Sequence, residues 1–102
     1  MTEVRLDVHE DADRELGDAA DYYDRESFGL GSAFIDEVER AYGRIRSTPL
    51  AAEEVDPGIR RLVLARFPYN LIYEVDDESA LVLAVAHQRK RPYYWRSRGR
   101  AG

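Results

Sequence analysis

The sequence contains no cysteine, one tryptophan and two histidines in 102 residues. Without cysteine the chain can form neither a disulfide nor a thiolate site, and it suits a reducing compartment. No apolar run approaches the roughly 20 residues needed to cross a bilayer, and residues 1–16 are too acidic for a signal peptide. We therefore expect a cytoplasmic protein that has no membrane partner.

Metal-binding and cofactor motifs are also missing. The acidic run Asp76-Asp77-Glu78 lacks the ligand spacing and the glycine of a calcium loop. It is interpreted as a turn. We expect no metal, no cofactor and no small-molecule substrate.

Length and composition indicate one small globular domain. The chain is 44% hydrophobic and 34% charged, which is typical of a folded protein rather than a disordered one. At this length a single core is expected. We assign residues 1–96 to the domain and predict that residues 97–102 are disordered.

The net charge of −5 conceals an uneven distribution. Residues 1–56 carry 6 basic and 16 acidic side chains, a net charge of −10, whereas residues 57–102 carry 9 basic and 4 acidic, a net charge of +5. Because salt screens charges over about 8 Å, local charge governs binding more than the total does. The acidic half can be interpreted as a solvated helical surface.

Three segments of the second half predict strands. Ile59–Ala65, Tyr69–Val75 and Ala80–Ala86 are rich in the aliphatic, β-branched and aromatic side chains that favour sheets. Phe67-Pro68 and residues 76–79 separate them with turn-forming residues. Short connections between consecutive strands predict an antiparallel meander.

The first half predicts a strand followed by two helices. Val4–Val8 alternates apolar and polar residues. From Glu10 the apolar residues recur at helical spacing, Gly29 and Gly31 interrupt the pattern, and a second helix covers about Ser32–Ser47. Leu50–Gly58 is interpreted as a connector. The predicted order is β-α-α-β-β-β, an α+β fold in which the helical hairpin packs on one face of a small, mainly antiparallel sheet and leaves the other face partly open.

Beyond the last predicted strand the chain becomes cationic and aromatic, with no acid in residues 87–100. His87 is either a base near neutral pH or a polar cap on the strand. Trp95 suits a hydrophobic anchor, and Arg96 suits either a solubilising charge or a contact. The candidate target-binding residues are Arg89, Lys90, Arg91, Tyr93, Trp95 and Arg96.

Three segments carry a resemblance to a known family: ADYYDRESFGLGSAFIDEVERAYGRI, RRLVLARFPYNLIYEV and VLAVAHQRKRPYYW. Together they resemble the RelE/ParE superfamily of toxins from type II toxin–antitoxin systems, over about residues 4–96. The resemblance implies a compact toxin fold. It also implies a cognate antitoxin that neutralises the toxin by wrapping its helices and sheet.

The superfamily divides by activity. RelE-like members cut mRNA in the ribosome, whereas ParE-like members poison DNA gyrase. RelE-like toxins resemble one another in placing an arginine directly after the tyrosine of the second meander strand, and here Asn70 follows Tyr69. An amide cannot neutralise the charge of a cleaving phosphate. The resemblance therefore favours a ParE-like gyrase poison.

Two alternatives remain open. The first is a RelE-like endonuclease, which needs a base, an acid and cations around the phosphate. Its candidate catalytic residues are His87, Arg61, Arg66, Arg89, Arg91 and Tyr94. The second is an attenuated relative that binds an antitoxin without being toxic.

Overall fold

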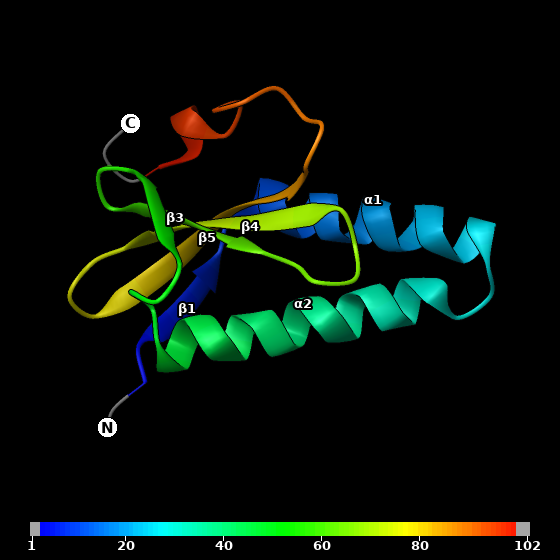
Figure 1. Cartoon of the computed structure of the whole chain (residues 1–102), viewed down its shortest axis with the longest axis horizontal. Helices are drawn as coiled ribbons and strands as arrows, with labels where there is room; N and C mark the ends of the chain where they lie inside the picture. The colour runs from blue at the N-terminus through cyan, green and yellow to red at the C-terminus, as the bar shows by residue number, and fades with distance from the viewer. Residues whose placement is uncertain (1–2, 100–102) are drawn as a thin grey trace.

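The computed structural model describes residues 3–99 and confirms the predicted α+β fold (Figure 1). Its elements are β1 (Arg5–Val8), α1 (Glu10–Glu26), α2 (Leu30–Ser47), β2 (Glu53–Asp56), β3 (Ile59–Val63), β4 (Tyr69–Val75), β5 (Ser79–His87) and a 3-10 helix, Arg96–Arg98. The strands form one sheet in the order β1-β5-β4-β3-β2. Only the β1–β5 pair is parallel. None of the helices in residues 3–99 is long and apolar enough to cross a membrane.

The connector after α2 contains a strand that the sequence did not predict. Within Leu50–Gly58, strand β2 pairs antiparallel with β3 and places Glu53 opposite Arg61 and Glu54 opposite Arg60. Glutamates have a low strand propensity, so the sequence pattern pointed to a loop. The ion pair between Glu53 and Arg61 across the two strands contributes stabilisation that the propensity lacks.

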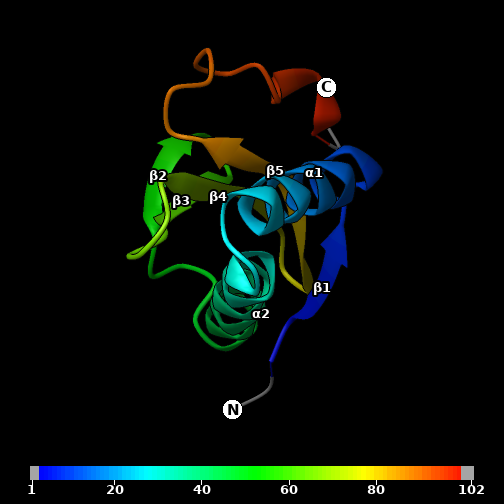
Figure 2. The same ribbon diagram turned by 90° about the vertical axis from the view of Figure 1, so that its right-hand side faces the viewer.

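The helical hairpin packs on one face of the sheet and forms the main core. Helices α1 and α2 lie side by side (Figure 2). From α2, Phe34, Val38 and Ile45 are fully buried against Leu71 and Val82 of the sheet. Burial of each such side chain contributes about 1.5–3 kcal/mol. The predicted hairpin therefore supplies one side of the main core, and the sheet supplies the other.

The opposite face of the sheet is covered as well. Residues 88–99, here called the C-terminal segment, lie on the side of the sheet away from α2 (Figures 1 and 2). Trp95 is only 5% exposed and packs in a second apolar cluster with Ile72 of β4 and Leu83 of β5. The prediction that Trp95 is a hydrophobic anchor is confirmed. The segment covers part of the face that was expected to be partly open, and a cavity remains between the two.

The end of the chain differs from the predicted disorder. Ser97–Gly99 are ordered around the 3-10 helix, and Arg98 is held by acids of α1, while residues 100–102 lie outside the described residues. A short polar sequence gives no sign of order when its partners lie about 80 residues away. Long-range ion pairs, not local propensity, order this stretch.

The helix pair offers a matched test of the core geometry. Gly31 of α2 donates its N–H to Asp24 Oδ1 of α1 at 2.8 Å, and a Cβ at Gly31 would collide with the Ala20 carbonyl oxygen. We expect Gly31→Ala to cost about 1–3 kcal/mol of unfolding free energy, because backbone must move. Urea unfolding measures this change.

Gly43, in the same helix, is the control. Apart from its own turn of helix, no described atom lies within 4 Å of the position that its Cβ would take. Gly43→Ala should therefore stabilise the protein by about 0.5–1 kcal/mol through helix propensity alone. Equal effects of the two substitutions would contradict the close packing of α1 on α2.

Candidate functional site

The C-terminal segment and strands β2, β3, β4 and β5 line a cavity of about 180 Å³. The four strands supply one side of it and the segment supplies the other. The lining residues are Val55, Arg61, Asn70, Ile72, Ala86, His87, Gln88, Lys90, Arg91, Pro92, Tyr93, Tyr94 and Trp95. The cavity is cationic and aromatic, as the sequence of the exit predicted. Among residues 3–99, no three His or acidic side chains gather as a metal site.

His87 occupies the point where β5 ends and the segment begins. Its Nδ1 accepts the Arg89 N–H at 3.0 Å, and its ring stands edge-on to Tyr69 at 5.1 Å between centroids. The Lys90 N–H donates to the His87 carbonyl at 2.9 Å. These bonds make His87 a cap that turns the chain. They also leave Nε2 as the nitrogen that carries the proton of the neutral ring.

The cations of this region fall into two groups. Arg61 pairs with Glu53 of β2 and Arg96 pairs with Asp56 at 3.3 Å. Arg89, Lys90 and Arg91 are exposed and form no ion pair with any described acid. The turn after His87 is therefore the place where positive charge is left available.

Tyr93 has a strained backbone. Its φ of 62° lies in the left-handed region, which costs a non-glycine residue roughly 1–2 kcal/mol. The Arg96 guanidinium lies 4.5 Å from the Tyr93 ring centroid, and the Trp95 ring lies 5.6 Å from it. The cation–π contact with Arg96 and the tilted contact with Trp95 help to hold a half-exposed tyrosine beside the cavity.

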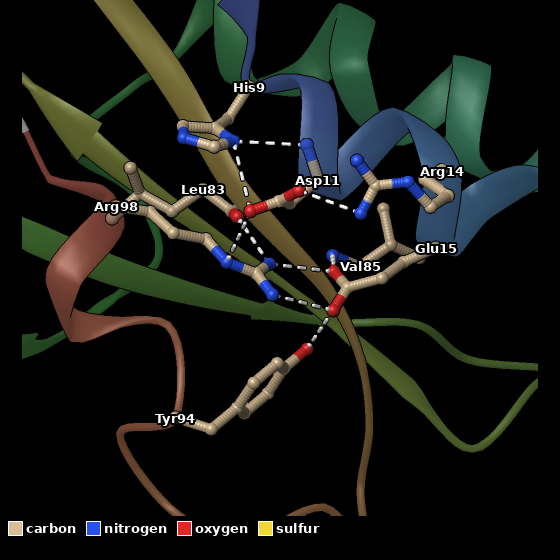
Figure 3. Close-up of polar contacts among 8 residues, drawn as sticks. All are labelled: His9, Asp11, Arg14, Glu15, Leu83, Val85, Tyr94 and Arg98. Atoms are coloured by element: carbon tan, nitrogen blue, oxygen red, sulfur yellow. Dashed lines mark hydrogen bonds and ion pairs between the residues drawn. The ribbon is translucent and has the colours of Figure 1, made fainter.

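A carboxylate of α1 holds the end of the segment. Figure 3 shows Glu15 facing Tyr94 and Arg98. The Tyr94 hydroxyl donates to Glu15 Oε2 at 2.8 Å, and Arg98 donates Nη1 to Oε1 at 3.0 Å and Nη2 to Oε2 at 3.1 Å. Arg98 Nε also lies 3.6 Å from Asp11 Oδ2. This group of Asp11, Glu15, Tyr94 and Arg98 is called the clamp below.

The clamp shifts the pKa of two of its members. Burial, followed by the Glu15 carboxylate, raises the pKa of the Tyr94 hydroxyl well above its usual value. For Arg98, burial alone would lower the pKa, but the bond and charge of Glu15 outweigh it and the net pKa is raised. Tyr94 therefore stays neutral and Arg98 charged at physiological pH.

Sequence reasoning missed Asp11 and Glu15. The available signal was their spacing of four residues, which places two acids on one side of a helix. That spacing is common on solvated helices, so it did not identify a partner. The N-cap of the same helix, His9, accepts the Asp11 N–H at 3.0 Å and fixes where the first of the two acids lies.

The structure brings most of the predicted site residues together. Arg61, His87, Lys90, Arg91, Tyr93, Tyr94 and Trp95 line the cavity. Arg89 and Arg96 lie outside its lining, Arg89 on the exposed turn and Arg96 against Asp56. Arg66 is elsewhere: its N–H donates to Glu37 Oε2 of α2 at 3.1 Å, and it lines a different hollow with Arg40 and Arg44. Of the residues proposed for RNA cleavage, the cavity therefore brings together His87, Arg61, Arg91 and Tyr94, but neither Arg66 nor Arg89.

The clamp predicts an alkaline weakening of the fold. Above pH of about 10 the unfolded chain releases the Tyr94 proton while the folded chain keeps it, so stability is lost as pH rises. The hydrogen bond to Glu15 contributes about 1.5–3 kcal/mol at pH of about 8, and Tyr94→Phe removes it. Above pH of about 10, the difference in unfolding free energy between the wild type and this variant should shrink by up to about 1.4 kcal/mol per pH unit. The slope should be smaller than this limit because solvent screens the half-buried site.

Urea unfolding between pH of about 8 and 11 measures this difference. Tyr22→Phe, at an exposed tyrosine of α1, is the control. A difference between wild type and Tyr94→Phe that stays constant over this range would show that the hydroxyl is not held by Glu15.

Comparison with known proteins agrees with the fold and with the resemblance. A solved structure described as "Chromosomal ParDE TA system from P. aeruginosa" is similar, with a TM-score of 0.74 and 17% identity over 83% of this chain and 96% of that one. At this identity the similarity concerns the fold. No curated protein sequence matches the chain. The profile of the family described as "ParE toxin of type II toxin-antitoxin system, parDE" matches residues 6–92, and the chain belongs to this family.

Proposed function

We propose that the chain is a ParE-like toxin that inhibits growth by poisoning DNA gyrase and is neutralised by a cognate antitoxin. The proposal rests on family membership and on one observation, the unpaired cationic turn. Arg89, Lys90 and Arg91 follow the end of β5, are exposed, and have no acidic partner among the described residues.

The turn is anchored well enough to present its charges in a fixed place. The Gln88 N–H donates to the Pro68 carbonyl and the Lys90 N–H to the His87 carbonyl, at 2.8 and 2.9 Å. Beside it, Tyr93 is 46% exposed. Guanidinium forks and an exposed tyrosine are the side chains that most often dominate a protein interface, and they suit an acidic surface of gyrase.

An RNA-cleaving activity has less support, although one observation favours it as an alternative. His87, Arg61 and Arg91 share a cavity, as a base and two phosphate-binding cations would. Against it, Asn70 takes the position where RelE-like toxins place an arginine. The Tyr94 hydroxyl is engaged by Glu15, and Arg66 lies outside the cavity. A non-toxic relative that only binds an antitoxin is the remaining alternative.

The target can be tested with the purified chain and gyrase. We expect wild type to inhibit DNA supercoiling and the Arg91→Ala variant to need at least about tenfold more protein, which corresponds to about 1.4 kcal/mol of binding free energy. Arg40→Ala is the control, because Arg40 is also exposed and pairs with no acid of residues 3–99 but lies on α2. Equal inhibition by all three proteins would exclude the cationic turn as the contact.

Expression of the chain alone separates the gyrase proposal from the nuclease alternative. We expect impaired supercoiling, and no cut mRNA from either wild type or His87→Ala. A prompt halt of protein synthesis with cleaved mRNA would overturn the gyrase proposal. In that case His87→Ala should cleave roughly 100-fold more slowly if His87 is the base, and an unchanged rate would remove it from catalysis.

A further inference from the structure

We infer that Glu15 of α1 is a positioning residue for the proposed target-binding surface: its carboxylate fixes the C-terminal segment, and with it the cationic turn, on the sheet. The inference rests on the proposed function and adds to it a residue far away in sequence. Glu15 lies 79 residues before Tyr94 and 83 before Arg98, which it binds.

The first argument concerns the edge of β5. Strand β1 pairs with β5 only as far as Val82, where the His9 N–H donates a hydrogen bond to the Val82 carbonyl at 2.8 Å. Beyond that point no strand of residues 3–99 lies beside β5 on this edge. Glu15 Oε1 accepts the Val85 N–H at 3.1 Å, and Arg98 Nη1 donates to the Leu83 carbonyl at 3.0 Å. The two charged side chains thus take the place that a neighbouring strand would occupy.

The second argument concerns the number of donors that meet at one carboxylate. Glu15 accepts four hydrogen bonds: one from β5, one from Tyr94 and two from the Arg98 guanidinium. The Glu15 and Arg98 side chains are 23% and 15% exposed, so these bonds are partly shielded from water. Charge-assisted bonds in such a place are strong and directional. These bonds keep the segment attached to α1 and also determine where on the sheet it lies.

The third argument is that the segment needs to be held. The left-handed Tyr93 stores backbone strain that would relax if the segment opened. Trp95 supplies apolar burial, which is not directional. On the other side of Tyr93, the cationic turn is attached through Gln88 to Pro68. Fixing both ends of residues 88–99 fixes the turn between them, and Glu15 makes the distal attachment.

The test uses Glu15→Gln, which keeps the length of the side chain and its oxygen but removes the charge that holds Arg98. Trp95 is the only tryptophan in the sequence, so fluorescence excited selectively at tryptophan reports on the segment alone. We expect the Trp95 emission to shift to longer wavelength and its quenching by acrylamide to increase. The spectra are recorded at a temperature where far-UV circular dichroism shows the variant to be folded.

Gyrase inhibition is measured on the same proteins. We expect Glu15→Gln to need at least about tenfold more protein than wild type. Glu26→Gln is the control, since Glu26 is exposed on the same helix and forms no described contact. Arg98→Lys, which preserves a cation for Glu15, should retain more inhibition and more Trp95 protection than Arg98→Gln. A role limited to overall stability would not make a folded variant expose Trp95.

The outcomes separate this inference from the function on which it rests. Unchanged Trp95 quenching in Glu15→Gln would overturn the positioning role, whatever the effect on gyrase. Increased quenching with undiminished inhibition would overturn it too, because the segment would be loose and the target still bound. A wild-type chain that leaves supercoiling unaffected would instead overturn the proposed function.

Discussion

A sheet with two apolar faces, and one pair of helices to cover them, is the constraint on which this structure depends. Helices α1 and α2 bury one face, so the other must be covered by something else or remain exposed to water. The C-terminal segment meets this need by placing Trp95 over Ile72 and Leu83. The surface proposed to bind a target is consequently part of the fold and not a free tail.

The same constraint explains the irregularity of β5. The register with β4 shifts between Ile72 and Tyr73, so that β5 has an extra residue, Leu83, and both Leu83 and Ala84 face the second cluster. Such a bulge increases the local twist of the strand. Here the bulge lies where β1 ends and where Arg98 donates a hydrogen bond to the Leu83 carbonyl. The same few residues of β5 therefore contribute to the second apolar cluster, mark the end of the pairing with β1 and bind the clamp.

The parts that the sequence predicted are those set by local pattern. Helical spacing, strand propensity and the turn residues gave the order of elements, and the cationic exit marked most of the cavity lining. Strand β2 was missed because its pairing depends on a residue outside the segment: Arg61 of β3 holds Glu53 across the sheet. Glu15 was missed for a similar reason, since nothing near it in sequence needs a carboxylate. Ion pairs between residues far apart in the chain produce no periodic pattern in the sequence.

Those pairings also explain how an acidic protein can present a basic surface. Acids of the first half form ion pairs with cations of the second half. The four pairs are Glu53–Arg61, Asp56–Arg96, Glu37–Arg66 and Glu15–Arg98. The acidic half is therefore more than a solvated surface. The guanidinium of Arg60 donates hydrogen bonds to the backbone carbonyls of Leu50 and Ala52. What this internal pairing leaves within the described residues of the second half is Arg89, Lys90 and Arg91, three consecutive cations on one turn. Because screening confines their field to about 8 Å, a partner that contacts the turn meets a positive surface even though the chain as a whole is negative.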